Sequence, residues 1–263
     1  MPRYRITVAY DGTNFHGWQK QHPPGAEPLR TVQGVLEEAV RSIAGLEKVN
    51  VLGASRTDSG VHARGQVAAF TIEREFDPEK LPMIITSRLP EDVQVLDAAI
   101  VDKSFSPISD CTAKGYRYTI AWGRMRGIQR PLFERHFVMW TGYELEVQRM
   151  QAAAPLLVGT HDFASFTRKS HGRETTVRTI FGCSARESGE REIQIDITGD
   201  GFLYNMVRII AGTLLEIGRG QWPPEKMKEI LEARDRDAAG PTLPPEGLCL
   251  EWVSYDKRPS AHA

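Results

Sequence analysis

The sequence predicts an α+β protein of two halves, with mostly antiparallel sheets joined side by side, helices on one face, and a cleft between the halves. Segments that alternate polar and apolar residues recur along the chain, and apolar stripes of helical period separate them. This succession of elements occurs twice. The first series has the order β-α-β-β-α-β, which is typical of a split βαβ unit.

The first half opens with a strand and a helix. Residues 4–10 alternate and are rich in β-formers, which predicts a strand. After it the apolar residues take up helical spacing, with Thr31 as a suitable N-cap and Gly45 as a suitable end. The apolar positions of this helix are Val32, Val35, Leu36, Ala39, Val40 and Ile43.

The rest of the first half alternates strands with one more helix. We expect short strands at 49–54 and 66–72, a helix at 81–89 and a strand at 93–101. The segment 103–110 then contains Ser, Pro and Asp without a clear period. We therefore place a boundary between two domains, residues 1–105 and 106–263.

The second half shows a similar mixture of patterns. Strands are expected at 116–122, 136–140, 179–187, 192–198 and 249–255, with a turn that includes Ser188 and Gly189 in the hairpin. Helices are expected at 147–157, 204–217 and 224–233. We find no repeat of fixed period, so the two halves are similar only in architecture.

Composition indicates a soluble, folded protein. Hydrophobic residues make up 41% of the chain and the net charge is −1, which excludes a disordered chain. No apolar run approaches the roughly 18 residues of a membrane span, and the N-terminus lacks the pattern of a signal peptide. The three cysteines form no CxxC pair, so neither disulfides nor a metal knuckle is expected. We expect a cytoplasmic protein that contacts no membrane.

Residues 53–65 form the densest cluster of chemically active side chains. Asp58 lies there between Arg56 and His62, among three glycines that let the backbone approach a ligand closely. Taken alone, an Asp in such a loop is more often a turn residue. Ser59 and His62 lie too close in one loop to form a triad with Asp58. His16, His62 and His161 lack the spacing of metal ligands, and we expect no metal.

Seven motifs follow one another along nearly the whole chain. They are residues 10–19, 31–39, 56–63, 114–118, 159–166, 201–208 and 240–248. In these motifs and their order the sequence resembles the tRNA pseudouridine synthase A family, whose members isomerise uridines in the anticodon stem-loop. One departure is the segment Phe105-Ser-Pro-Ile108, where the family often has Phe-His-Ala-Arg. We interpret it as a local change in packing or RNA contact.

The resemblance implies a role for particular residues. Asp58 matches the essential aspartate, as nucleophile; Arg208 matches the basic residue that pairs with it. Tyr116 matches a tyrosine that stacks on the flipped base and whose hydroxyl can relay a proton. Strand alternation puts Tyr118 on the same face, so only motif position favours Tyr116.

The resemblance also implies which residues contact the substrate. Expected substrate contacts are Tyr116, Arg56, His62, Arg64, Lys114, Arg168 and Lys169. Further basic contacts are expected at Arg3, Lys20, Arg124, Arg126, Arg130, Arg173 and Arg178, and Trp18 either stacks on RNA or packs in the core.

The resemblance also implies a substrate, a reaction and an assembly. The substrate would be uridine 38, 39 or 40 of tRNA, bound across a homodimer, with the active site in the cleft between the halves of one chain. The isomerisation needs no redox change or group donor, so no cofactor is expected. A buried carboxylate tends to take up a proton, and a neighbouring guanidinium counters this. Two other functions stay open: a non-catalytic RNA-binding module of similar fold, and a nucleoside hydrolase that uses the same aspartate.

Overall fold

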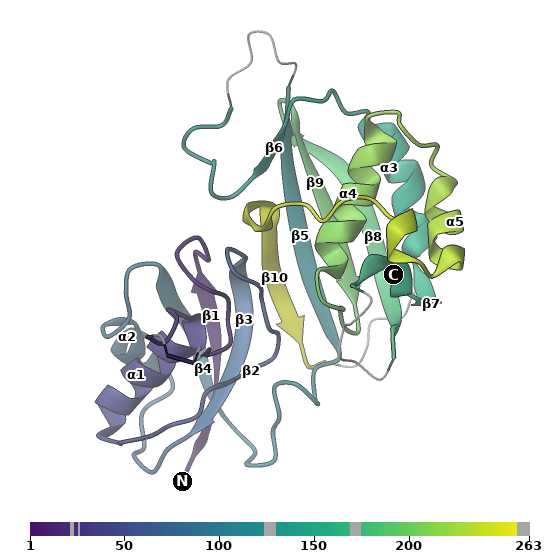
Figure 1. Ribbon diagram of the computed structural model, residues 1–263. Helices are drawn as coiled ribbons and strands as arrows, with labels where there is room; N and C mark the ends of the chain where they lie inside the picture. Colours follow the sequence, from purple (N-terminus) through teal and green to yellow (C-terminus); the bar gives the residue numbers. More distant parts are fainter. Residues whose placement is uncertain (22–23, 26, 124–129, 169–174, 257–263) are drawn as a thin grey trace. The chain divides into compact units, whose positions relative to one another are not determined.

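In the computed structural model the chain forms two compact units, Met1–Thr112 with Cys249–Tyr255, and Ala113–Leu248. The structure describes residues 1–21, 24–25, 27–123, 130–168 and 175–256 (Figure 1). The first unit extends to Thr112, so it ends seven residues after the expected boundary at residue 105. The expectation also put the last strand in the second domain. It belongs to the first unit because Cys249 and Leu250 pair with His62 and Ala63, a long-range contact that local periodicity does not reveal.

The sheet of the first unit is mostly antiparallel. Its strands are β1 (Arg3–Tyr10), β2 (Leu52–Gly53), β3 (His62–Thr71), β4 (Val93–Val101) and β10 (Leu248–Ser254). The order is β4-β1-β3-β10, and β2 pairs with β3. Only β10 runs parallel to its neighbour β3. The expected strands at 4–10 and 93–101 are confirmed, whereas β3 begins four residues earlier than the expected start at 66.

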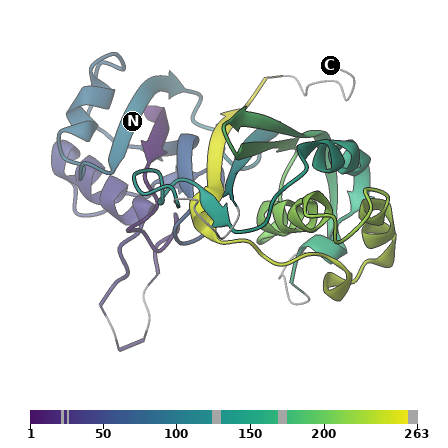
Figure 2. The same ribbon diagram turned by 90° about the horizontal axis from the view of Figure 1, so that it is seen from above.

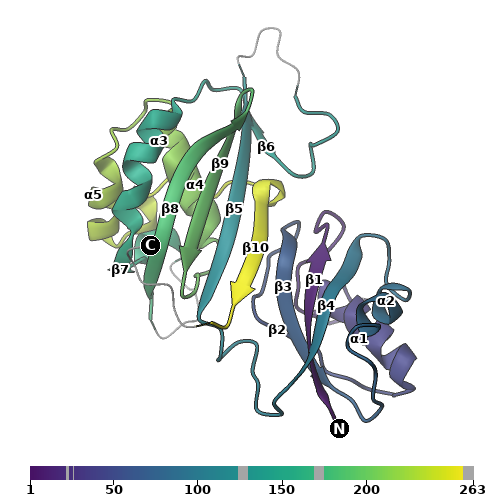
Figure 3. The same ribbon diagram turned by 180° about the vertical axis from the view of Figure 1, so that it is seen from behind.

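Two helices, α1 (Val32–Ala44) and α2 (Leu81–Thr86), lie on one face of this sheet (Figures 1 and 3). The predicted ends of α1 are confirmed: Thr31 Oγ1 accepts from the Gly34 N–H, and Gly45 takes a left-handed conformation with φ 67°. The buried side of α1 carries the predicted apolar stripe except Val35, and it also buries Glu37. α2 ends three residues before the expected 89.

The sheet of the second unit has strands β5 (Ala113–Trp122), β6 (Met139–Thr141), β7 (Gly159–Asp162), β8 (Val177–Gly189) and β9 (Glu192–Gly199). Its order is β5-β9-β8-β7, with β6 parallel to β5. The β8–β9 hairpin is confirmed, but the prediction that its turn includes Ser188 and Gly189 is wrong. Gly189 pairs with Glu192, and the turn uses Arg191 at φ 60°. The short strand β7 was not predicted because only four residues of it pair.

Helices cover one face of the second sheet (Figures 1 and 2). They are α3 (Val147–Ala153), α4 (Met206–Gly218) and α5 (Lys226–Ala233). The expected helix 147–157 changes at Pro155, a residue without an N–H to donate, into the 3₁₀ helix η1 (Ala154–Leu157). Along α4 almost every side chain is buried, and Arg208 and Glu216 are the exceptions. The α+β class, with helices on one face, is confirmed for each unit.

No helix in the described ranges combines the length and the hydrophobicity that crossing a bilayer requires. In α1 one apolar stripe is buried, as expected for an amphipathic helix, whereas α4 is buried on nearly all sides.

Cys183 on β8 makes stability depend on pH. Burial, and to a smaller extent the charge of Asp196, raises the pKa of its thiol from 9.0 to about 12. Between these values the unfolded chain loses the thiol proton while the folded chain keeps it, so the free energy of unfolding falls as pH rises. Above pH ~9.5, urea unfolding of the wild type should lose about 1.4 kcal/mol per pH unit more than that of Cys183→Ala. Equal slopes would contradict this assignment.

Candidate active site

The loop that carries Asp58 connects β2 to β3 in the first unit and is anchored at both ends. At its start the Ala54 N–H donates to Val67 O at 2.7 Å. The fully buried Gln66 side chain accepts from the Ser55 N–H at 3.2 Å and donates to Ser55 O at 2.7 Å. At its end the Val61 N–H donates to Asp58 O at 3.2 Å and closes a turn. Asp58 therefore lies, half-buried, on a short turn with fixed ends.

A second loop, from the motif at 10–19, packs directly against the Asp58 loop. The Trp18 N–H donates to Thr57 O at 3.1 Å, and the Gly60 N–H donates to Phe15 O at 3.2 Å. Gly17 has φ 88°, and a Cβ on it would lie 2.6 Å from Thr57 O. Only glycine satisfies both the left-handed backbone and this close approach. The backbones of the two motifs are therefore in direct contact.

Trp18 is a core residue. Its side chain is 2% exposed, and its ring lies 6.2 Å from that of Tyr10. A Cβ on Gly53 would approach the Trp18 ring to 2.3 Å. Of the two readings left open by the sequence, stacking on RNA or core packing, the structure supports packing. The Tyr10 hydroxyl in turn lies 2.8 Å from Thr57 Oγ1, so these aromatic rings support the loop from below.

His62 is buried at the first position of β3. Its side chain is almost completely covered, and Nδ1 accepts from the Gly12 N–H at 3.0 Å. The same nitrogen lies 3.2 Å from Asp11 Oδ1. A Cβ on Gly12 would lie 2.0 Å from Val61 O. In this position the imidazole fixes the start of the motif at 10–19 beside the Asp58 loop.

The two arginines of the loop motif are exposed. One guanidinium nitrogen of Arg56 donates to Gln19 Oε1 at 3.1 Å. The Arg64 side chain is 73% exposed and lies 3.9 Å from Glu251 Oε2, a distance at which an exposed ion pair contributes little stability. Both charged groups are available to a ligand in solution.

In the second unit Arg208 is held in a fixed orientation. It lies in the first turn of α4, where Nε donates to Leu243 O at 2.7 Å and Nη1 donates to Asn205 Oδ1 at 2.9 Å. An arginine beside an apolar stripe usually extends into solvent. Here the two acceptors keep the half-buried guanidinium close to the protein.

Tyr116 and Tyr118 lie on the same face of β5, but their surroundings differ. Tyr118 is fully buried and donates to Pro244 O at 2.6 Å. Burial raises the pKa of Tyr118 well above its ordinary value, the charge of Glu246 adds to this, and the charge of Arg208 opposes it. Tyr116 is 7% exposed, and its ring meets the edge of Phe202 at 5.1 Å. Tyr118 thus has a structural hydrogen bond, and Arg208 is close enough to affect its pKa.

The segment 240–244 supplies the acceptors for Arg208 and Tyr118, a role that sequence reasoning missed. A Cβ on Gly212 of α4 would lie 1.9 Å from Pro241 O. The Gly240 N–H donates to Thr213 Oγ1 at 3.0 Å. The segment therefore lies against the α4 backbone. A glycine within an apolar helix, together with the Gly-Pro motif at 240, was the available signal.

The other expected substrate contacts are spread over the second unit. Lys114 is half-buried on β5, opposite Gly199 of β9. Arg168 is exposed, with its guanidinium carbon 4.6 Å from the centre of the Tyr204 ring. Lys169, Arg124, Arg126 and Arg173 lie outside the described residues.

Two of the other basic residues are bound within the first unit. Lys20 pairs with Glu37, and Arg3 donates to Phe105 O at 2.7 Å. The latter contact belongs to the segment that departs from the family motif. There the Tyr255 hydroxyl donates to Pro107 O at 3.0 Å, and the rings of Tyr255 and Phe105 lie 5.0 Å apart. The departure at 105–108 therefore takes part in local packing.

Within the part of the chain that the structure describes, no group of three or more His, Cys, Asp or Glu residues is placed to hold a metal ion. The chemistry of the described site residues is that of one carboxylate, guanidinium groups and phenol rings.

Comparison with known proteins gives one consistent result. The model of a family described as tRNA pseudouridine synthase matches residues 6–107 and 153–256, more than half of the chain. The tRNA pseudouridine synthase A of Thermoanaerobacter pseudethanolicus is 42% identical over 255 residues, 97% of this chain and 100% of that protein. That of Caldicellulosiruptor saccharolyticus is 43% identical, over 95% of this chain and 98% of that protein. That of Clostridium kluyveri is 40% identical, over 97% and 100%.

Gly17 allows a direct test of the contact between the two loops. We expect Gly17→Ala to displace the Asp58 loop, because its Cβ would overlap Thr57 O, and to lower the free energy of unfolding by about 2 kcal/mol or more. Gly25→Ala is the matched control: φ is 73° there, with no atom within 4 Å of the added Cβ. Urea unfolding of both variants measures the difference. Equal losses would show that backbone strain alone, rather than loop contact, requires a glycine.

Proposed function

Because the chain belongs to the tRNA pseudouridine synthase family, we propose that it converts uridine to pseudouridine at positions 38, 39 and 40 of tRNA. The family match over most of the chain carries this proposal, and the anchored Asp58 loop supports it. The alternative of an RNA-binding module without chemistry gives no reason for a carboxylate on so firmly fixed a turn.

The reaction rearranges one nucleotide without adding or removing atoms. The bond between N1 and C1′ breaks, the uracil turns, and C5 joins C1′; C5 loses a proton and N1 gains one. No electrons are exchanged with a partner, so the proposed reaction requires no cofactor. The protein must extract the base from its stack, hold the ribose, and help the glycosidic bond to break.

We assign the nucleophile to Asp58. Three routes use this carboxylate: attack on C1′, addition to the uracil ring, or help in removing a proton from the sugar. Each route needs an ionised carboxylate at a fixed distance from the nucleotide. A fixed backbone supports such a placement: anchors at Ala54, Ser55 and Thr57 hold the chain before Asp58, and the Gly60 N–H, which donates to Phe15 O, holds it after Asp58.

Arg208 is proposed to keep Asp58 ionised. A guanidinium stays charged at any working pH, so a neighbouring carboxylate is favoured in its charged form. The hydrogen bonds from Arg208 to Leu243 and Asn205 support this role, since they fix the guanidinium before any substrate binds. Such preorganisation avoids the cost of ordering a long side chain during the reaction.

Tyr116 is proposed to stack on the flipped uracil. Base–aromatic stacking is worth roughly 1–3 kcal/mol, which offsets part of the cost of flipping. The Tyr116 hydroxyl is also a candidate proton relay. Tyr118 is the less suitable ring, because its hydroxyl already donates to Pro244 O inside the unit.

Basic residues are proposed to bind the RNA backbone, with the tightness of binding falling as salt increases. The set consists of Arg56, Arg64, Lys114, Arg168 and Lys169. The stacked pair of Arg168 and the 46% exposed Tyr204 ring offers a charged and an aromatic surface together. His62 was also expected to contact substrate. Because its Nδ1 accepts from the Gly12 N–H, we propose that it acts by holding the motif at 10–19 beside the Asp58 loop.

The same family resemblance supports a proposal about assembly and place of action. We propose a cytoplasmic homodimer that holds the tRNA across both subunits. Light scattering of the purified protein, alone and with one equivalent of tRNA per dimer, measures the stoichiometry directly.

Replacing Asp58 by Ala should abolish pseudouridine formation while tRNA binding stays within about twofold of wild type. The measurement is incubation with an unmodified tRNA transcript, followed by position-resolved detection of pseudouridine. Asp97→Ala, an exposed carboxylate on β4, is the matched control and should retain activity. Near-normal product from Asp58→Ala would exclude the proposed role, and free uracil in the products would favour a nucleoside hydrolase.

Replacing Arg208 by Met should lower the rate by at least about 100-fold, because it removes the proposed charge partner of Asp58 but keeps much of the apolar stem. Arg186→Met, on the exposed part of β8, is the control. Unchanged activity at neutral pH would refute the pairing.

A further inference from the structure

Residues 17–20, here called the connecting segment, are hydrogen-bonded on one side to the Asp58 loop and on the other to α1. On the loop side the Trp18 N–H donates to Thr57 O at 3.1 Å. On the helix side the Gln33 N–H donates to Trp18 O at 3.0 Å. Because one residue makes both contacts, a movement of the connecting segment relative to α1 would be passed to the loop.

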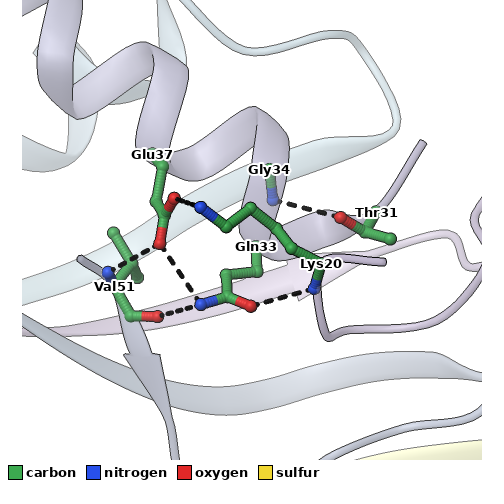
Figure 4. Close-up of polar contacts among 6 residues, drawn as sticks. All are labelled: Lys20, Thr31, Gln33, Gly34, Glu37 and Val51. Atoms are coloured by element: carbon green, nitrogen blue, oxygen red, sulfur yellow. Dashed lines mark hydrogen bonds and ion pairs between the residues drawn. The ribbon is translucent and has the colours of Figure 1, made fainter. Parts of the chain in front are cut away.

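The Gln33 side chain ties the connecting segment to the strand that leads into the loop (Figure 4). Its Oε1 accepts from the Lys20 N–H at 3.0 Å. Its Nε2 donates to Val51 O at 3.1 Å and to Glu37 Oε1 at 3.2 Å. Val51 directly precedes β2, from which the Asp58 loop begins. The Gln33 amide thus joins the connecting segment, which packs against the loop, to Val51, which precedes the loop in the chain.

Glu37 completes this network from the buried side of α1. Oε1 accepts from the Val51 N–H at 3.1 Å, and Oε2 pairs with Lys20 Nζ (Figure 4). The residue is only 7% exposed. A carboxylate on the apolar side of a helix costs stability compared with a hydrophobic side chain unless every oxygen is paired. Here both oxygens are paired, and both partners belong to segments that adjoin the loop.

The network also extends to Arg56. Gln19, in the middle of the connecting segment, accepts from the Arg56 guanidinium at 3.1 Å. The segment that Gln33 and Glu37 hold is therefore in contact with the loop at two residues, Arg56 and Thr57, immediately before Asp58.

We propose that Gln33 and Glu37 are positioning residues for Asp58, acting through the connecting segment and Val51 without touching the substrate. This inference rests on the proposed function of the Asp58 loop. Misplacement of a reacting group by about 1 Å can lower a rate roughly 100-fold while leaving binding intact. Loss of the network should therefore reduce the chemical step more than the affinity for tRNA.

The experiment compares Gln33→Ala and Glu37→Gln with the control Glu38→Gln, the neighbouring carboxylate on the exposed side of α1. Glu37→Gln keeps the shape of the side chain. The substitution does not leave the Lys20 ammonium buried without a partner, because the Lys20 side chain is 40% exposed beside an open cavity of about 620 Å³. The measurements are the single-turnover rate of pseudouridine formation, the Kd for tRNA, and amide hydrogen exchange at Trp18 and Val61. All are made at a temperature where each variant stays folded.

We expect the single-turnover rate to fall about tenfold or more in Gln33→Ala and severalfold in Glu37→Gln, with Kd within about twofold and faster exchange at both amides. Glu38→Gln should match wild type. A wild-type rate in Gln33→Ala, even with faster exchange, overturns this inference alone. So does a loss of rate that only follows a loss of tRNA affinity. A wild-type protein that makes no pseudouridine overturns the proposed function as well.

Discussion

Direct backbone contact between two loops is the constraint on which the Asp58 site depends. Thr57 O accepts from the Trp18 N–H, and the space beside this contact admits no Cβ at Gly17. The rings of Tyr10 and Trp18 pack beside this contact, and the imidazole of His62 holds the other end of the same loop at Gly12. A turn held in this way fixes the backbone of Asp58 at one place.

The second unit uses the same physical device for a different group. Segment 240–244 approaches α4 so closely that Gly212 and Gly240 have no room for a side chain. This approach brings the carbonyl groups of Leu243 and Pro244 to Arg208 and Tyr118. In both units glycine permits two backbones to meet, and the meeting orients a polar side chain. The glycines of the motifs are therefore part of the site even though they carry no chemistry.

Much of the fold could be predicted because the spacing of apolar residues within short segments indicates which segments form helices and strands. The helix α1 shows this best: the apolar spacing, Thr31 as N-cap and Gly45 as the end all belong to one short window. Where prediction was poor, the deciding interaction lay elsewhere. The strand β7 exists only because Gly159–Asp162 pairs with β8, and the start of β3 at His62 depends on pairing with β10. For the site, motif order identified Asp58, Arg208 and Tyr116 as candidates. The contacts of Leu243 O with Arg208 and of the Gln33 amide with Val51 O join separate segments of the chain, and motif order did not reveal them.

The sequence alone determined the class of fold, the positions of most helices and strands, and the family, because these depend on residue types at short and regular spacing. The tertiary structure decided which side chains became structural. From the sequence, Trp18 and His62 could have contacted RNA as well as supported the fold, and Tyr118 could have been the stacking ring as well as Tyr116. Their burial and hydrogen bonds are set by neighbours that are distant along the chain: Gly53 and Gly12 for the first two, Pro244 for the third. Such contacts depend on how the loops fold back on one another, which residue spacing does not encode.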